Sequence, residues 1–230
     1  MLKDIQETGD GFLTRFHPRF QQTYHSMHGA LQEAQHVFLR ESLVEERLRL
    51  GHRTRILEVG FGLGLNFLMT CRMAQNAATT IEYTALECDL LDAEQLRKMR
   101  YAELLDVQPL GNAFYAWRAQ YPDQMSAGTY DFSFDADIQL QLQIGDALSA
   151  TLQGDFDAVY LDAFSPDANP ELWTPDFLNR LARVMAPEAR LTTYSAKGAV
   201  RRALQEAGLE VLKRPGPPGK REMLTAIKRA

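Results

Sequence analysis

Hydrophobic and polar residues follow two patterns along this chain, and each pattern predicts one kind of element. Short apolar or alternating runs predict strands over residues 54–59, 81–87, 138–144, 157–161 and 189–194. Apolar residues spaced three and four apart predict helices over residues 65–74, 91–105, 111–121, 175–185 and 197–207. Two more strands, over 209–213 and 223–227, enclose a loop rich in proline and glycine.

The order of these elements predicts the fold class. Strands that alternate with helices form an α/β fold, in which helices cover both faces of a doubly wound, mostly parallel sheet. The last pair of strands predicts an antiparallel closing strand at one edge of this sheet. Residues 126–137 are rich in Asp, Gly and Ser and predict a loop or hairpin turn.

Length and composition favour one main domain. A chain of 230 residues with 45% hydrophobic content can bury one sizeable core, which we assign to residues 51–230, and residues 1–50 form an N-terminal extension. No apolar run approaches the roughly 20 residues of a membrane helix, and the N-terminus lacks the apolar core of a signal peptide. We therefore predict a cytoplasmic protein with no membrane partner, in which Cys71 and Cys88 are reduced thiols.

The charge distribution leaves nucleic-acid binding open. The formal net charge of −5 excludes a protein-wide basic field. From Arg180 to the C-terminus, however, cations outnumber acids. This local excess fits an ordinary solvated surface as well as a contact with phosphates.

The stretch Ile-Leu-Glu-Val-Gly-Phe-Gly-Leu-Gly at residues 56–64 is the strongest chemical signal. A buried strand ends in Gly60, Gly62 and Gly64, where the missing side chains let the backbone turn sharply and approach a ligand. A dinucleotide loop usually has the spacing G-x-G-x-x-G, whereas G-x-G-x-G after an acid is typical of an S-adenosylmethionine (SAM) loop. The acid here is Glu58, for which we predict contact with the ammonium end of SAM; a dinucleotide loop and a purely structural turn remain alternatives.

Three more acids follow predicted strands on the same side of the sheet. Glu87 can accept both hydroxyl hydrogens of a ribose, and Asp146 can accept from an adenine amino group. Asp162 leaves the fourth strand beside the expected position of the methyl donor, and the loop after it carries Phe164 and Asn169, so we predict that this loop holds substrate. Each acid alone could also cap a strand end or a turn. No metal site is predicted.

Several longer motifs resemble one enzyme family. They are Glu-Val-Gly-Phe-Gly-Leu-Gly-Leu-Asn-Phe-Leu, Leu-Asp-Ala-Phe-Ser-Pro-Asp-Ala-Asn-Pro-Glu-Leu-Trp, Thr-Tyr-Ser-Ala-Lys-Gly-Ala-Val-Arg-Arg-Ala-Leu and Gly-Lys-Arg-Glu-Met. Together with the segment from Tyr24 to Leu39, they are similar to the methyltransferase domains that act in the biosynthesis of 5-methylaminomethyl-2-thiouridine in tRNA. The similarity runs over nearly the whole chain.

The resemblance implies a class I SAM-dependent methyltransferase that methylates the aminomethyl group of a wobble uridine in tRNA. Gly60, Gly62, Gly64 and Asn66 would then hold the amino acid end of SAM, Glu87 its ribose and Asp146 its adenine, while residues 1–50 would pack over this site. Asp162 would face the substrate amine as the catalytic residue. No FAD-dependent oxidase half is found in this chain, so we expect it to perform only the methyl transfer.

Further residues would bind the tRNA in this reading. Phe164 and Tyr194 would stack on the base, although both could equally be core aromatics. The phosphates would be bound by Lys197, Arg201, Arg202, Lys220 and Arg221. Two other functions stay open: a methyltransferase or aminopropyl transferase that acts on a small amine, and a noncatalytic SAM-binding module.

Overall fold

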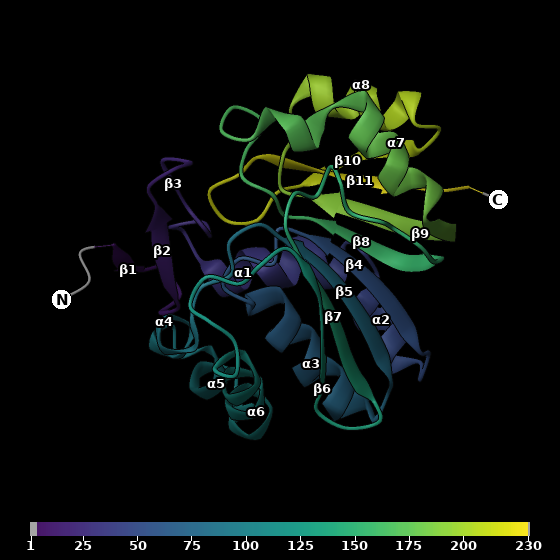
Figure 1. The fold of residues 1–230 in the computed structure, drawn as a ribbon. Helices are drawn as coiled ribbons and strands as arrows, with labels where there is room; N and C mark the ends of the chain where they lie inside the picture. The colour runs from purple at the N-terminus through teal and green to yellow at the C-terminus, as the bar shows by residue number, and fades with distance from the viewer. Residues whose placement is uncertain (1–3, 230) are drawn as a thin grey trace.

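The computed structural model describes residues 4–229 and has one large sheet of eight strands in the order β10-β11-β9-β8-β4-β5-β7-β6 (Figure 1). The central strands run parallel, in the pairs β9–β8, β8–β4, β4–β5 and β5–β7, whereas β6, β11 and β10 pair antiparallel with their neighbours. The strand bounds are β4 Thr54–Val59, β5 Ile81–Glu87, β6 Gly128–Ser133, β7 Ile138–Ile144, β8 Phe156–Leu161, β9 Met185–Thr193, β10 Glu210–Pro215 and β11 Glu222–Ile227. The predicted fold class, with its antiparallel closing strand, is confirmed.

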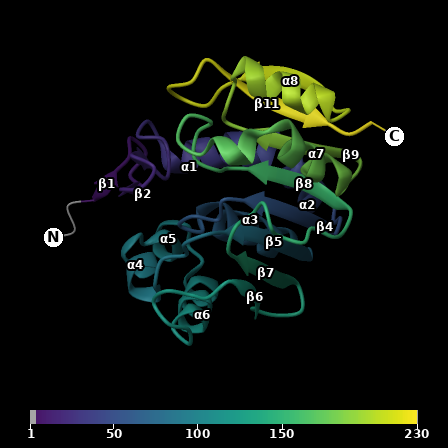
Figure 2. The same cartoon turned by 45° about the horizontal axis from the view of Figure 1, so that its top comes forward.

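Helices cover both faces of the sheet because the central strands present apolar side chains on both sides. On one face, Leu57, Val159 and Leu191 pack in a cluster with α7 (Pro175–Arg183) and α8 (Gly198–Glu206). The other face packs against a larger group of helices, seen together with the sheet in Figure 2. These are α1 Ala30–Glu33, the π-helix Ala34–Arg40, α2 Val44–Arg49, α3 Leu65–Ala77, α4 Ala93–Lys98, α5 Tyr101–Leu104 and α6 Gln108–Arg118.

The N-terminal residues form a second, small antiparallel sheet of β1 (Ile5–Glu7), β2 (Leu13–His17) and β3 (Gln22–Thr23). In both views it lies to one side of the large sheet, close to α4 and α5 (Figures 1 and 2). The hydroxyl of Tyr101 in α5 donates to the carbonyl of Leu13, 2.5 Å away. This contact fixes the small sheet against the helices beside the carboxyl ends of the large sheet.

The predicted strands at 54–59, 81–87 and 138–144 are confirmed to the residue. The prediction of a loop or hairpin turn over 126–137 is correct for residues 134–137, which turn between the antiparallel strands β6 and β7, but wrong for residues 128–133, which pair with β7 as the edge strand β6. This strand buries only Phe132, so the sequence carries almost no apolar signal for it. The single helix predicted over 91–105 is two short helices, because Arg100 between them has a left-handed φ of 58°.

Helix 175–185 was also predicted too long. α7 ends at Arg183 and Met185 already begins β9, in which Met185 is fully buried. No helix within residues 4–229 is long and apolar enough to cross a membrane.

Candidate active site

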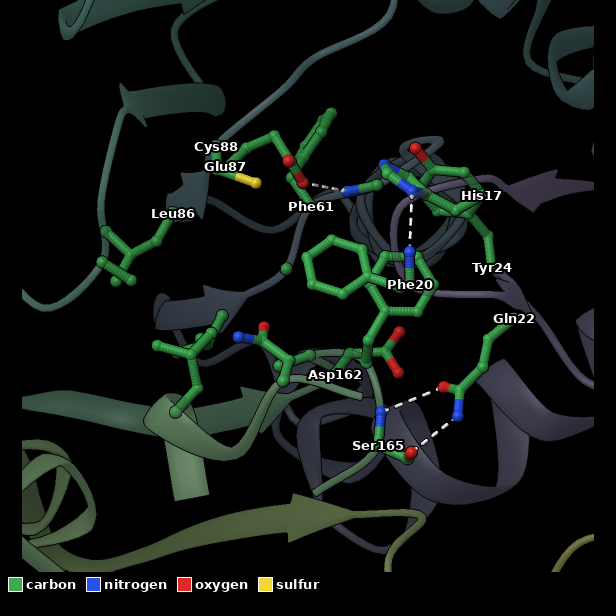
Figure 3. Close-up of a pocket in the computed structure, with 18 of the residues that line it drawn as sticks. His17, Phe20, Gln22, Tyr24, Phe61, Leu86, Glu87, Cys88, Asp162 and Ser165 are labelled. Carbon is green, nitrogen blue, oxygen red and sulfur yellow. Dashed lines mark hydrogen bonds between the residues drawn. The ribbon is translucent and has the colours of Figure 1, made fainter. Parts of the chain in front are cut away.

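A cavity of about 750 Å³ opens at the carboxyl ends of β4, β5, β7 and β8, where ligands bind in open α/β sheets. This volume lies in the upper part of the range for small-molecule sites, roughly 300–1,000 Å³. Of the predicted site residues, it is lined by Gly60, Gly62, Asn66, Glu87, Asp146, Asp162, Phe164, Asn169, Tyr194 and Lys220. The structure therefore gathers most of the predicted cofactor and substrate residues around one space. Figure 3 labels two of them, Glu87 and Asp162.

The glycine loop lies against two other parts of the cavity wall. Gly60 has a φ of 90°, and a Cβ on it would lie 2.7 Å from the carbonyl oxygen of Asp162. A Cβ on Gly62 would lie 3.0 Å from the Tyr24 ring. Glycine at these positions lets the ends of β4 and β8 approach each other and lets the N-terminal segment rest on the loop.

Glu87 holds the loop in place. Its carboxylate accepts hydrogen bonds from the backbone N–H groups of Gly62 and Asp89, both at 2.8 Å. A carboxylate oxygen has more than one acceptor position, so Glu87 can still accept from a ribose hydroxyl in the cavity. On the neighbouring strand end, Asp146 accepts from the N–H of Leu148 at 2.9 Å, and both residues line the cavity.

Asn66 connects the glycine loop with Asp162. Its Nδ2 donates to Glu58 Oε1 and to Asp162 Oδ2, each at 2.8 Å. The second oxygen of Glu58 accepts from the Tyr83 hydroxyl at 3.0 Å, and Glu58 is fully buried. Burial raises the pKa of Glu58 to about 8.

Glu58 thus lies behind the cavity wall rather than in it. Glu58 is fully buried and does not line the cavity, and its two oxygens accept from Asn66 and Tyr83. The contact of Glu58 with the ammonium end of SAM stays a prediction; Asn66, which donates to Glu58, lines the cavity, whereas Glu58 does not. The buried Oδ1 of Asn66 has no hydrogen-bond partner among residues 4–229, and an ammonium group would satisfy it.

Asp162 lies where the cofactor residues meet the rest of the cavity. Burial and the neighbouring carboxylates of Glu58 and Glu33 raise the pKa of Asp162 well above its usual range. A raised pKa makes this carboxylate a better proton acceptor than an ordinary aspartate. Asp162 is therefore suited to orient an amine and to receive its proton.

Aromatic side chains from the N-terminal segment pack around Phe164, two residues after Asp162. Phe20 stacks on Phe164 with a centroid distance of 4.4 Å, and the rings of His17 and Tyr24 each lie 5.2 Å from Phe164. His17 Nδ1 accepts from the backbone N–H groups that follow it in the turn, and burial lowers the pKa of its ring. The cluster forms an apolar cover of the kind on which a flat base can stack.

A polar contact ties this cover to the Asp162 loop. Gln22 Nε2 donates to Ser165 Oγ at 2.7 Å, and the backbone N–H of Ser165 donates to Gln22 Oε1 at 3.2 Å (Figure 3). None of His17, Phe20, Gln22 and Ser165 was among the residues predicted for the site. Ser165 lies in the motif that follows Asp162, whereas His17, Phe20 and Gln22 precede the N-terminal segment that resembles the family.

The predicted phosphate-binding cations divide into two groups. Lys197 and Lys220 form ion pairs with Asp167 and Glu33. Arg201, Arg202 and Arg221 do not line the cavity, and their contact with tRNA stays a prediction. Arg19, which sequence reasoning missed, lines the cavity and lies 5.2 Å from the centroid of Phe20.

The fold and the cavity together define the class. A doubly wound sheet with a glycine loop, an acid after the next strand and a carboxylate opposite them is the arrangement of a class I SAM-dependent methyltransferase. A family model described as S-adenosyl-L-methionine-dependent methyltransferase matches residues 108–229, more than half of the chain. The chain belongs to this family, and SAM is its methyl donor.

Individual relatives agree with the family. The chain is 37% identical over 217 residues to the "tRNA 5-methylaminomethyl-2-thiouridine biosynthesis bifunctional protein MnmC" of Cupriavidus necator, covering 92% of this chain and 32% of that protein. It is 38% identical over 220 residues to the protein of the same name from Ralstonia nicotianae, covering 93% and 33%. The chain thus spans about a third of the length of these curated relatives.

A solved structure is similar over almost the entire chain. It is the crystal structure of MNMC2 from Aquifex aeolicus, with a TM-score of 0.76 and 28% identity, covering 99% of this chain and 70% of that one. The likeness therefore includes the N-terminal strands and the loop between β10 and β11 as well as the large sheet.

Proposed function

We propose that this protein transfers a methyl group from SAM to the aminomethyl nitrogen of 5-aminomethyl-2-thiouridine at the wobble position of tRNA, giving 5-methylaminomethyl-2-thiouridine. The names of its relatives and the resemblance of its motifs support this substrate. The observation that carries the proposal is the position of Asp162, a carboxylate fixed by Asn66 between the cofactor residues and an aromatic cover. A tRNA substrate places the reaction in the cytoplasm.

The cofactor residues divide along the ligand. Gly60, Gly62 and Asn66 would hold its amino acid end, Glu87 its ribose and Asp146 its adenine. In this arrangement the N-terminal segment around Phe20 and Tyr24 acts as a cover for the site, because Tyr24 lies on the glycine loop and Phe20 on Phe164. When bound, SAM supplies a methyl group that is already activated by a positively charged sulfur.

Asp162 has two tasks in this reaction. A free alkylamine has a pKa near 10.4, by analogy with lysine, and is mostly protonated at neutral pH. Asp162 accepts a hydrogen bond from the amine, directs its lone pair and takes up a proton, for which its raised pKa is suited. Proximity and orientation supply most of the remaining rate, because the methyl donor needs no further activation.

The test is to incubate the protein with labelled SAM and tRNA that carries 5-aminomethyl-2-thiouridine, and then to identify the labelled nucleoside after digestion. We expect the label in 5-methylaminomethyl-2-thiouridine alone. Transfer to small amines but not to tRNA would instead favour a small-molecule methyltransferase. SAM binding without transfer to either would favour a noncatalytic module.

A further inference from the structure

The ammonium group of Lys220 lies in the wall of the cavity. Lys220 follows the loop at residues 215–219, and its Nζ forms an ion pair with Glu33 Oε1. The same Nζ lies 3.9 Å from the centroid of the Tyr194 ring. A primary alkylammonium is thus held by a carboxylate and an aromatic face, the combination that proteins use to bind ammonium ligands.

The groups that hold this ammonium are themselves fixed. The side chain of Glu33 is 9% exposed, and its Oε2 accepts from the backbone N–H of Ser26 at 2.9 Å. The hydroxyl of Tyr194 donates to the carbonyl of Ala163 at 2.8 Å. Glu33 and Tyr194 would therefore keep their positions if Lys220 moved away.

Lys220 itself has a route out of the cavity. Its side chain is 32% exposed, and the lysine stem is flexible. Among the acidic side chains of residues 4–229, Glu33 alone lies within 4 Å of the Lys220 ammonium. Moving it would break one ion pair and one contact with the Tyr194 ring.

The same corner of the cavity adjoins the proposed catalytic residue. Ala163, which accepts the hydrogen bond from Tyr194, directly follows Asp162. All three residues line the same cavity as the glycine loop. The negative charge of Glu33 and the positive charge of Lys220 both act on the Asp162 carboxyl. A cation bound at Glu33 and Tyr194 therefore shares one cavity with Asp162.

We propose that Glu33 and Tyr194 form the binding site for the protonated amine of the substrate, and that Lys220 occupies this site until the substrate displaces it. The inference rests on the proposed function, since an aminomethyl group has the same charged head as a lysine side chain. Lys220 then acts as an internal competitor that keeps the buried carboxylate paired in the free protein. This role differs from the phosphate contact that was predicted from the sequence: Lys220 leaves its place when the substrate binds, instead of binding the substrate.

The test compares two anticodon stem-loops that differ only in the 5-aminomethyl or 5-methyl group of the wobble 2-thiouridine. Their dissociation constants are measured at one salt concentration for the wild type, Lys220→Met and Glu33→Gln. Lys213→Met is the matched control, because Lys213 forms an exposed ion pair with Glu222 and does not line the cavity. SAM affinity and the unfolding temperature show whether each variant is folded.

We expect the wild type to prefer the aminomethyl stem-loop. Glu33→Gln should reduce this preference about tenfold, and Lys220→Met should increase it about threefold, within the range of charged and cation–π contacts. Lys213→Met should leave it unchanged. If Lys220→Met fails to fold, Lys220→Gln takes its place, and the result for Glu33→Gln still decides.

Two results would overturn the inference. An unchanged preference in folded Glu33→Gln means that the amine binds elsewhere. Weaker binding of both stem-loops to Lys220→Met, with a flatter salt dependence, means that Lys220 contacts phosphate. In either case, continued methyl transfer by the wild type leaves the proposed function intact, whereas a wild type that neither transfers methyl nor distinguishes the stem-loops contradicts both.

Discussion

The cavity has two halves that are built in different ways. The cofactor half consists of Gly60, Gly62, Glu87 and Asp146, which follow three neighbouring strands of the large sheet. Its main contact, from the Gly62 N–H to Glu87, joins the ends of adjacent strands. The acceptor half consists of Phe20, Glu33, Phe164, Tyr194 and Lys220, which come from the N-terminal segment and from loops after β8, β9 and β10.

This difference shows how one fold serves many substrates. The Glu33–Lys220 pair joins residues 187 positions apart, and the Gln22–Ser165 contact joins residues 143 apart. The Gly62–Glu87 contact of the cofactor half joins residues only 25 positions apart, so the contacts that assemble the acceptor half span far more of the chain. The two halves meet at Asp162, which Asn66 ties to the glycine loop side.

Replacing Asp162 should break the connection between the halves and give the largest effect. Asp162→Asn should cut methyl transfer about ten- to a thousandfold while SAM affinity stays nearly the same, because the amide keeps the shape but loses the charge that orients the amine. Partial recovery is expected as pH rises from 7 to 9.5, since more of the amine is then neutral. Single-turnover transfer to aminomethyl-bearing tRNA is the measurement, and a wild-type rate would reduce Asp162 to a structural role.

Glu58→Gln tests whether Glu58, which is buried behind the cavity wall, keeps its proton in the folded protein. The pKa of Glu58 is raised from 4.5 to about 8, so the folded protein retains a proton that the unfolded chain releases. The wild type should therefore lose free energy of unfolding as pH rises from 5.5 to 8, and this loss should be about 3 kcal/mol smaller in the variant. Urea denaturation at both pH values measures it; equal losses in the two proteins would show that Glu58 is charged throughout.

Glu87→Ala should weaken the cofactor half alone. We expect SAM affinity to fall by about 1.5–3 kcal/mol, because a charged acceptor of hydrogen bonds is removed and the loop N–H groups lose their partner. Calorimetry with SAM measures the change, with Glu94→Ala in α4 as an exposed acidic control outside the cavity. Equal affinities for the two variants would mean that Glu87 does not contact the cofactor.

Phe20→Leu should affect the acceptor half alone, with the smallest effect. Loss of the stacked pair with Phe164 should raise the apparent KM for tRNA by a factor that corresponds to roughly 0.5–1.5 kcal/mol of binding free energy, while SAM affinity stays the same. Steady-state kinetics with tRNA as the varied substrate provide the test. A parallel loss of SAM affinity would show that the aromatic cover serves both halves.

The same contrast explains what could be predicted from the sequence. The strands at 54–59, 81–87 and 138–144 carry continuous apolar or alternating patterns and were predicted to the residue. The edge strand β6 was missed because an exposed strand depends on its partner rather than on its own apolar residues. The break at Arg100 was missed because a left-handed arginine leaves no trace in the apolar spacing.

For the candidate site, the glycine loop and the acids after the strands could be found because strand ends converge at one edge of a parallel sheet. Asn66 could also be predicted as a site residue from the loop motif, but its hydrogen bonds to Glu58 and Asp162 could not be predicted. Glu33 and the aromatic cover could not be located, because their place depends on how the N-terminal segment packs. Lys220 was assigned to a phosphate from its charge alone, although its position shows a partner in Glu33.

The most direct test of the two-half account is a crystal structure with S-adenosylhomocysteine and an anticodon stem-loop that carries 5-aminomethyl-2-thiouridine. The account predicts the homocysteine end at the glycine loop, the ribose at Glu87, and the amine nitrogen within hydrogen-bond distance of Asp162, between Phe164 and Tyr194. An amine outside the acceptor half, or an adenine bound beneath Phe20, would contradict it.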